Sequence, residues 1–307
     1  MNSPAEESVN KTYILLIIVM MLWGGTFVAG RHLAATFDPF VIAFYRFLSA
    51  SIVLVLATVY RQGKLPRLDK WQILKVFFLG FTGVFCYNYF FFAGLARIEA
   101  GRASVIIATN PTITALLAPI FLKEEFTPRK FLGVLLALTG ALTVITHGAP
   151  WLIFQEGIGV GELFLFGAVL TWVTYTLLGK VALKKLSPLE ATTYACLIGT
   201  TLLFPFALKN GLLDFPVIAT SLHWFNIFFL GVLATAIGFI WYYQGIRHIG
   251  AARAAAFINF VPLFGLTSGA LFLGETPDSS LLSGALLVIA GVSLANLKKI
   301  SFKRSQE

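Results

Sequence analysis

The strongest constraint on this chain is a series of long apolar runs, separated by short charged or Gly/Pro-containing segments. A bilayer core about 30 Å thick is crossed by roughly 20 helical residues, and ten runs of that order follow one another along the 307 residues. The strands of a transmembrane barrel need only about 10 residues of alternating polarity, so these longer runs do not fit a barrel. Helices are the other structure that satisfies backbone hydrogen bonds in lipid. The sequence predicts an all-α integral membrane protein with ten transmembrane helices. The predicted spans are 12–30, 38–60, 73–95, 103–122, 130–147, 159–179, 188–208, 224–246, 254–273 and 280–297.

Composition agrees with a surface that faces lipid, because 58% of the residues are hydrophobic and only 12% are charged. A net charge of +9 could indicate a nucleic-acid binder, but the basic residues form short clusters between apolar runs. We therefore expect lipid and a small-molecule substrate as partners, and no nucleic acid. Cys86 and Cys196 both fall inside apolar runs, so we expect neither a disulfide framework nor a metal site. No cofactor is predicted.

The distribution of positive charge predicts the orientation. With the amino terminus in the cytoplasm, 18 Lys and Arg residues fall in cytoplasmic segments and 4 in external ones. The positive-inside rule therefore places both termini in the cytoplasm. The run 12–30 follows Glu6 and Glu7 and is longer than a signal-peptide core, so we expect it to be retained as the first span.

The second half of the sequence repeats the first. At an offset of 149, Trp23, Gly30, Pro39 and Tyr45 fall on Trp172, Gly179, Pro188 and Tyr194. At an offset of 151, Gly80, Gly94, Arg102, Pro111, Glu124, Gly133 and Gly140 fall on Gly231, Gly245, Arg253, Pro262, Glu275, Gly284 and Gly291. Each repeat holds five spans, an odd number, so the two copies enter the membrane from opposite sides. Inverted repeats are typical of transporters that work by alternating access around one central site.

Four segments resemble one known family. They are WGGTFVAGRHL at 23–33, DPFVIAFYRF at 38–47, NPTITALLAPIFLKEEFTPRKFLGVLLALTGALTV at 110–144 and VPLFGLTSGALFLGETPDSSLLSGALLVIAGVSL at 261–294. Together they are similar to the drug/metabolite transporter superfamily, in particular its EamA-type members with ten spans. Where the family commonly has Gly before Glu after the fourth span, this chain has Lys123. The resemblance implies a transporter and leaves the cargo open, since members carry amino acids, purines, sugars, drugs and other metabolites.

These observations predict the following organisation: a cytoplasmic tail over 1–11, a first five-helix EamA-like repeat over 12–147, an external linker over 148–158, a second repeat over 159–297 and a basic cytoplasmic tail over 298–307. We expect a multi-pass protein of the cytoplasmic membrane that is a monomer or a weak dimer.

Polar and aromatic residues deep in the spans are the candidates for lining a substrate site, because unpaired polar groups are costly there. Trp23, Thr26 and Phe27 share one helix face, and the repeat places Trp172, Tyr175 and Thr176 on the equivalent face. Interfacial belts or bundle packing are the alternative roles for these aromatic residues. The predicted lining residues are Trp23, Thr26, Phe27, Tyr87, Asn88, Asn110, Trp172, Tyr175, Thr176, Trp241, Tyr242 and Asn259.

Three further residues have predicted roles within the spans. Pro111 and Pro262 each remove a backbone donor in matching spans, which predicts hinges at discontinuous helices or, as the alternative, static kinks. Arg46 is the one strongly basic residue well inside a span. It is assigned a charge or gating role, with an anionic cargo or a structural anchor as the two readings.

The function predicted from the sequence is secondary transport, most simply export, of a small metabolite such as an amino acid or a similar zwitterionic or amphipathic compound. No span carries a central Asp or Glu, so facilitated flux, or weak coupling through acids at the rim, is favoured over a buried-carboxylate antiporter. The four histidines are scattered and the enzyme motifs HExxH and GxSxG are absent, so the chain is not expected to be an enzyme. A non-transporting membrane partner or sensor is the alternative, and an intramembrane enzyme acting on a lipid-linked substrate is a more remote one.

Overall fold

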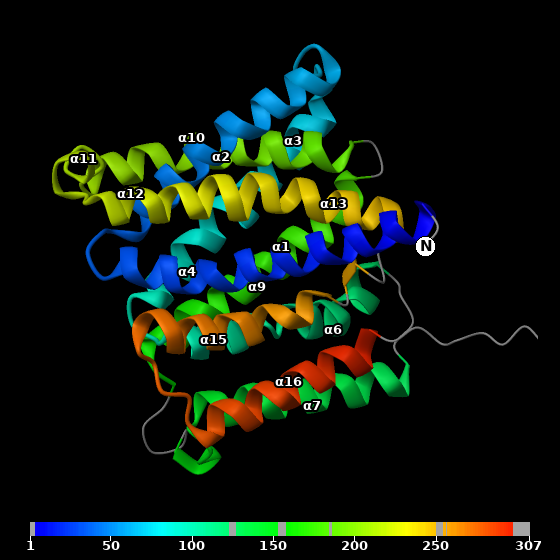
Figure 1. Ribbon diagram of the computed structural model, residues 1–307, viewed down its shortest axis with the longest axis vertical. Helices are drawn as coiled ribbons and strands as arrows, with labels where there is room; N and C mark the ends of the chain where they lie inside the picture. The colour runs from blue at the N-terminus through cyan, green and yellow to red at the C-terminus, as the bar shows by residue number, and fades with distance from the viewer. Residues whose placement is uncertain are drawn as a thin grey trace, which may run out of the picture.

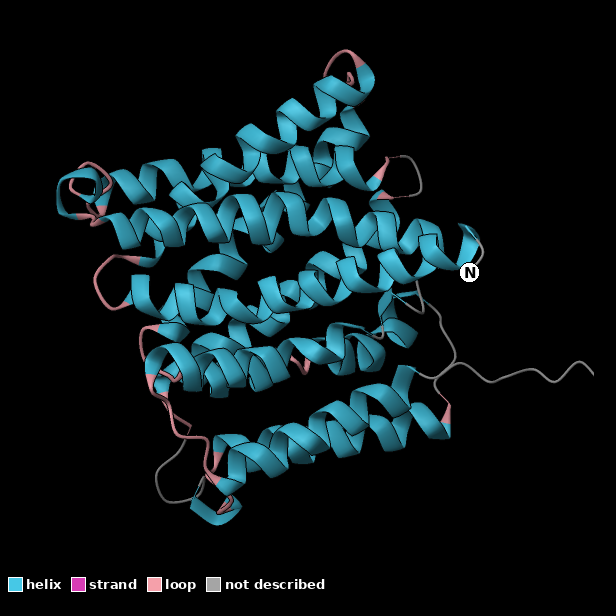
Figure 2. Cartoon of the chain, viewed as in Figure 1, coloured by secondary structure: helices cyan, strands magenta, loops and turns pink. Residues whose placement is uncertain are grey.

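The computed structural model describes residues 4–122, 127–152, 158–183, 186–249, 254–255 and 257–296. The predicted carboxy-terminal tail and the first residues of the amino-terminal tail lie outside these ranges. All regular structure in the described ranges is helical (Figure 2). The predicted all-α fold is therefore confirmed.

The helices run side by side along a common direction, as expected for a bundle that crosses a bilayer (Figure 1). By length and composition, eight helical segments of the described residues can span a membrane, and two shorter apolar helices, Ile258–Leu273 and Ser279–Ala295, complete the predicted ten. Exposed apolar side chains such as Leu56, Phe121 and Leu286, each more than 60% exposed, give the bundle the surface that lipid requires.

The first repeat contains α1 (Pro4–Ala34), α2 (Pro39–Gln62), α3 (Lys70–Leu79), η1 (Gly80–Cys86), α4 (Tyr87–Leu95), α5 (Ala100–Ile107), α6 (Asn110–Leu122) and α7 (Pro128–Ile145). A short turn, η2 (Pro150–Leu152), lies in the connection. The second repeat contains α9 (Val160–Ala182), α10 (Pro188–Lys209), α11 (Phe215–Ile218), α12 (Ser221–Phe228), η3 (Phe229–Ile237), α13 (Gly238–Ile249), η4 (Ile258–Phe260), α15 (Val261–Leu273) and α16 (Ser279–Asn296).

Local sequence signals fix several helix ends close to the predicted positions. The Asp38 carboxylate accepts the Phe40 backbone N–H at 2.8 Å, and Pro39 occupies the first helical position of α2. Gly63 closes the same helix in the left-handed region, at φ 74°, a conformation that favours glycine. These caps explain why the span predicted at 38–60 begins and ends where it does.

Contacts between matched positions establish the inverted repeat in three dimensions. The hydroxyls of Ser51 on α2 and Thr200 on α10 lie 3.3 Å apart, and the two residues are 149 positions apart. The helices α7 and α16 lie together at the lower edge of the bundle (Figure 1). There a Cβ on Gly140 would lie 2.6 Å from the Gly284 carbonyl, and a Cβ on Gly284 would lie 2.7 Å from the Gly140 carbonyl. Such mutual contacts are what a two-fold relation between two copies produces.

A feature that the sequence did not predict is a π-helix in the middle of each of two matched spans, the third and the eighth. The π-helix η1 begins at Gly80 and η3 begins at Gly231, and these glycines are 151 positions apart. A Cβ on Gly80 would lie 2.8 Å from the Ala195 carbonyl, and one on Gly231 would collide with the Arg46 carbonyl. Each π-helix thus packs closely on the second helix of the other repeat, and π-helical segments frequently mark functional sites.

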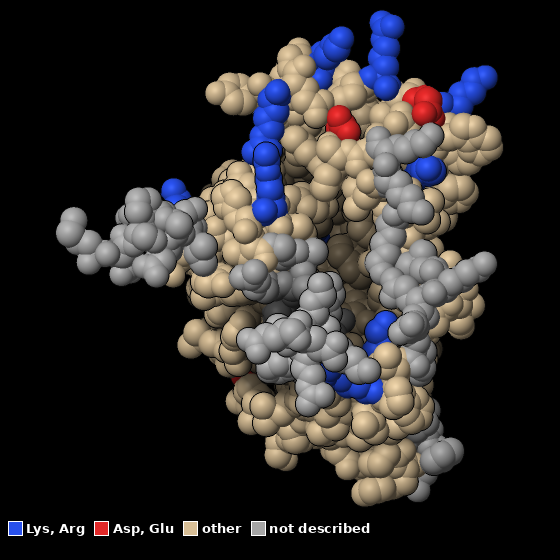
Figure 3. Space-filling view, turned by 90° about the vertical axis from the view of Figure 1, so that its right-hand side faces the viewer, with Lys and Arg blue, Asp and Glu red and all other residues tan. Residues whose placement is uncertain are grey.

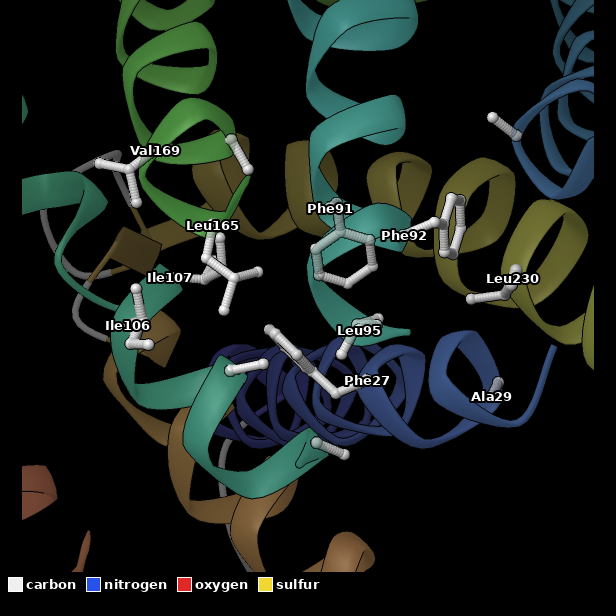
Figure 4. Packing of buried hydrophobic residues seen from close by; sticks show 14 of the residues in the cluster. Phe27, Ala29, Phe91, Phe92, Leu95, Ile106, Ile107, Leu165, Val169 and Leu230 are labelled. Carbon is white, nitrogen blue, oxygen red and sulfur yellow. The ribbon is translucent and has the colours of Figure 1, made fainter. Parts of the chain in front are cut away.

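The apolar core lies where α1, α4, α5 and α9 converge (Figure 4). Phe91, Phe92 and Leu95 of α4 pack between Phe27 of α1 and Leu165 of α9, and each of these side chains is buried. This packing fixes α4 relative to both repeats. It therefore determines where the polar residues next to it on α4 are placed.

Candidate functional site

One side of the bundle is hollowed. Figure 3 looks onto the side that bears the amino-terminal end of α1 and shows the surface receding near its middle. Lys and Arg side chains project from the upper part of this side. We call it the basic face, defined by the end of α2 at Gln62 and the beginnings of α3 at Lys70 and of α10 at Pro188.

The opposite face holds a carboxylate that joins the two repeats. Glu275, from the second repeat, accepts the backbone N–H of Ala100 at 2.7 Å and that of Gly101 at 2.9 Å, at the beginning of α5 in the first repeat. The Arg31 Nε lies 3.5 Å from the same carboxylate, whose side chain is only 10% exposed. A negative group at a helix amino terminus is favoured by the free N–H donors and by the helix dipole.

A second ion pair lies on the same face. The Arg102 Nη2 is 3.1 Å from the Asp278 carboxylate and 3.1 Å from the His147 Nδ1. Hydrogen bonding by the Ser280 hydroxyl, followed by the Leu281 N–H and the charge of Arg102, lowers the pKa of Asp278 to about 2 despite some burial. We call Arg31, Arg102, Glu275 and Asp278 the inter-repeat latch. Glu124, the counterpart of Glu275 in the repeat, lies outside the described residues.

Arg46 lies at the centre, between the two π-helices. Its Nη1 donates to the Asn88 Oδ1 at 3.1 Å, and its Nε and Nη2 both donate to the Thr235 hydroxyl at 3.2 Å. The Asn88 amide in turn donates to the Val84 carbonyl at 2.9 Å, and the Thr235 hydroxyl donates to the Leu230 carbonyl at 2.7 Å. A charge at this depth costs at least about 2.5 to 3.5 kcal/mol, which these neutral acceptors partly offset.

Most of the predicted aromatic residues form two groups. In the first, the rings of Trp23 and Tyr242 lie 5.2 Å apart, and the Trp23 indole donates to the Ala234 carbonyl in η3 at 2.9 Å. In the second, the Trp172 ring lies 5.0 Å from Tyr87 and 5.2 Å from Tyr175. Phe91 joins this second group to Phe27, with ring distances of 5.6 Å to Tyr87 and 5.3 Å to Phe27. The structure thus brings together most of the aromatic residues that the sequence singled out.

The threonines predicted to line the site hydrogen-bond to their own helices. The Thr26 hydroxyl donates to the Trp23 carbonyl at 2.6 Å, and the Thr176 hydroxyl donates to the Trp172 carbonyl at 2.9 Å. Trp241 is half-buried on α13 and, among the described residues, its ring joins neither aromatic group.

The two asparagines at the matched helix interruptions differ in their surroundings. Asn259 donates from Nδ2 to the Ser293 hydroxyl at 3.0 Å and therefore faces α16. Asn110 is 8% exposed, and its Oδ1 has no hydrogen-bond partner among the described residues. Of the two, only Asn110 leaves a buried acceptor open.

Both matched prolines lie where the helix is interrupted. The helix α5 ends at Ile107 and α6 begins at Asn110, immediately before Pro111. In the second repeat the 3-10 turn η4 (Ile258–Phe260) precedes α15, whose second residue is Pro262. The discontinuity follows from the missing N–H of proline, whereas a hinge role stays a prediction.

Sequence reasoning missed Thr235 as the partner of Arg46 and the latch contacts of Glu275. The residue matching Thr235 in the first repeat is Val84, so the repeat gave no indication of a polar position. A signal was nevertheless present, because a guanidinium inside a span must find acceptors and Thr235 is a lone hydroxyl in an otherwise apolar stretch near Gly231. Glu275 could not be paired with Ala100 and Gly101, because these two residues bind it through their backbone N–H groups.

Comparison with known proteins assigns the chain. The sequence profile of the EamA-like transporter family matches residues 10–146 and 159–297. The chain belongs to this family. A Bacillus subtilis protein named "Uncharacterized transporter YyaM" is 32% identical, with 92% of this chain and 93% of that protein covered. An "Uncharacterized transporter" of Archaeoglobus fulgidus is 31% identical, with 94% and 99% covered.

A more distant relative has a more specific name. A protein of Streptantibioticus cattleyicolor named "Probable terminal-alkyne amino-acid exporter" is 27% identical, with 96% of each chain covered. One crystal structure superposes with a TM-score of 0.60 over 94% of this chain and 98% of that chain, at 17% identity, and supports the fold alone. The family and the relatives establish a multi-pass membrane transporter.

Proposed function

We propose that this transporter moves a small organic metabolite, an amino acid or a similar zwitterionic or amphipathic compound, out of the cell by alternating access. The observation that carries the proposal is the arrangement of the two inverted repeats. They enclose a polar and aromatic centre, are hollowed on the basic face and are tied together on the opposite face by the inter-repeat latch.

The chemistry of the centre supports this choice of cargo. Trp23 and Trp172 provide flat apolar surface from equivalent positions in the two repeats, while Arg46 and Asn88 provide polar groups. A few placed polar groups in an otherwise apolar, aromatic environment are typical of small-molecule sites. A relative named as an amino-acid exporter points to the same class of compound.

The proposed setting is the cytoplasmic membrane, with both termini and the basic face in the cytoplasm, as the positive-inside rule favours. In that orientation the structure is open to the cytoplasm and closed to the outside. Opening the latch and closing the basic face would give the second state of the cycle, which inverted repeats provide at similar energy. We further propose that the protein works as a monomer or a weak dimer.

The proposal is tested with purified protein in liposomes. The liposomes are loaded with a mixture of the amino acids and other small metabolites, and the compounds released are measured by mass spectrometry. We expect release of a restricted set of compounds, and lower release by Trp23→Ala at an equal yield of folded protein. The matched control is Trp224→Ala, because Trp224 is 41% exposed and lies near the beginning of α12. The proposal would be contradicted if, for every compound, release equals that from loaded liposomes without the protein.

A further inference from the structure

We infer that Arg46 is the anchor for a carboxylate group of the cargo, so that the cargo supplies the counter-charge that the protein leaves out. The inference rests on the proposed transport function. It adds the role of one residue and the chemical group that this residue recognises.

Arg46 faces the inside of the bundle. It shares a helix face with Ile42, Ala43 and Ala50, which are fully buried, since residues three and four apart lie on one side of a helix. The lipid side of α2 is marked by Ile52, which is 55% exposed. The Arg46 side chain is nevertheless only half-buried. Its accessible surface therefore belongs to the interior, which is hollowed on the basic face (Figure 3).

The charge of Arg46 is not compensated by a carboxylate within the described part of the chain. Its hydrogen-bond acceptors, Asn88 and Thr235, are neutral, and its guanidinium lies 5.2 Å and 5.9 Å from the ring centres of Phe47 and Phe92. Among the described residues, no carboxylate lies within ion-pair distance of it. A guanidinium inside the bundle with neutral neighbours attracts an anion, because its surroundings screen charge less than water does.

The guanidinium also keeps donors for a ligand. Of its five N–H bonds, three are used by Asn88 and Thr235, and the other two have no partner within the described part of the chain. Two N–H bonds from one planar guanidinium fit the two oxygens of a carboxylate. An ammonium group accepts no hydrogen bond, and an amide offers one neutral acceptor oxygen in place of two charged ones.

The surroundings hold the guanidinium in place. Asn88 and Thr235 are oriented by carbonyls within or next to the π-helices, at Val84 and Leu230, so each repeat contributes one fixed acceptor. Side chains locked by such secondary contacts lose little freedom when a ligand arrives. The arrangement occurs once, because the position equivalent to Arg46 in the second repeat is Ala195. One carboxylate is therefore bound per transporter.

The test compares acids with their amides. Thermal unfolding of the purified full-length protein is recorded with 3-phenylpropionate and 3-phenylpropionamide, with isovalerate and isovaleramide, and with L-phenylalanine and L-phenylalaninamide, at equal ionic strength. A ligand bound only by the folded state raises the unfolding temperature. We expect each acid to bind at least about tenfold more tightly than its amide, since a charged hydrogen-bonded pair is lost with the amide.

Three variants separate recognition from stability. Arg46→Gln should abolish the preference for acids, and Arg46→Lys should retain part of it. Arg61→Gln changes an exposed arginine on the same helix and should keep the full preference. If Arg46→Gln does not fold, the wild-type comparison and the Lys variant decide. Equal shifts by acids and amides, no shift by any acid, or a preference that persists in Arg46→Gln would overturn the inference. A sodium chloride titration distinguishes a carboxylate site from a general anion site, because full competition by chloride in the millimolar range would also overturn it.

The outcome is separable from that of the transport experiment. Metabolite release without a preference for acids in binding would refute the role of Arg46 and leave transport standing. A preference for acids that depends on Arg46, with no release of any compound, would refute transport and leave a carboxylate-binding membrane protein.

Discussion

The replacement of Glu275 by glutamine tests the inter-repeat latch most sharply. The carboxylate accepts two backbone N–H groups at the beginning of α5 and lies beside Arg31. Hydrogen bonds to a charged group contribute about 1.5 to 3 kcal/mol each and neutral ones about 0.5 to 1.5 kcal/mol. Glutamine has the same shape, but it is uncharged and only one of its terminal atoms accepts. We therefore expect the latch to weaken by about 2 to 3 kcal/mol, with little solvent screening because the side chain is 10% exposed.

Hydrogen–deuterium exchange of peptides covering residues 96–108 measures this change directly. A loss of about 2 kcal/mol raises the exchange rate of the amides of Ala100 and Gly101 roughly 30-fold, since about 1.4 kcal/mol corresponds to a factor of ten. Glu162→Gln is the matched control, because Glu162 is in the first turn of α9 and, among the described residues, forms no hydrogen bond or ion pair with the first repeat. A change below about twofold in Glu275→Gln, or an equal change in the control, would refute the latch.

Four further substitutions test stability. The pKa of Asp278 is about 2 in the folded state and about 3.9 when unfolded. Its contribution to stability is therefore complete above about pH 5 and falls between pH 4 and 2. Asp278→Asn should remove this part of the stability loss in acid, measured by thermal unfolding at a series of pH values. Gly140→Ala places a Cβ 2.6 Å from a backbone carbonyl of α16 and should cost about 1 to 3 kcal/mol. In contrast, Gly179→Ala, with open space around it in α9, should stabilise by about 0.5 to 1 kcal/mol. Thr235→Val removes the acceptor of two Arg46 N–H bonds and should cost about 1 to 3 kcal/mol in chemical unfolding, with the apolar shape retained.

Much of the fold could be predicted because it depends on signals that lipid makes strong. Apolar length fixes the spans, and Pro39 and Gly63 fix the ends of α2. The match of Pro111 with Pro262 indicated where two spans are interrupted, because a missing N–H has the same local effect in any surroundings. These features are local in the chain or repeat at a fixed offset, and both kinds can be read from one sequence.

The site could be predicted only in part, because its contacts join distant segments. Trp23 and Trp172 were found through the repeat, and each has a tyrosine ring within 5.2 Å. Asn259 lies, like Asn110, at a helix interruption before a matched proline, but it bonds to Ser293 on α16, a partner that spacing does not reveal. The π-helices also went unpredicted. They coincide with close packing between the repeats at Gly80 and Gly231, which local propensity does not reveal.

The central claim, that two inverted repeats carry a small metabolite by alternating access, is tested most directly by counterflow. Liposomes containing the protein are loaded with an excess of an unlabelled compound that the release experiment identifies, and a trace of the labelled compound is added outside. An alternating carrier accumulates the label transiently above its external concentration. Export of the abundant unlabelled compound repeatedly returns the binding site to the outside, where it picks up label, whereas label inside competes with the unlabelled compound for the return. We predict such an overshoot for the wild type and a reduced one for Trp23→Ala. Equilibration of the label without any overshoot, as in a channel, or no uptake by folded protein, would contradict the account.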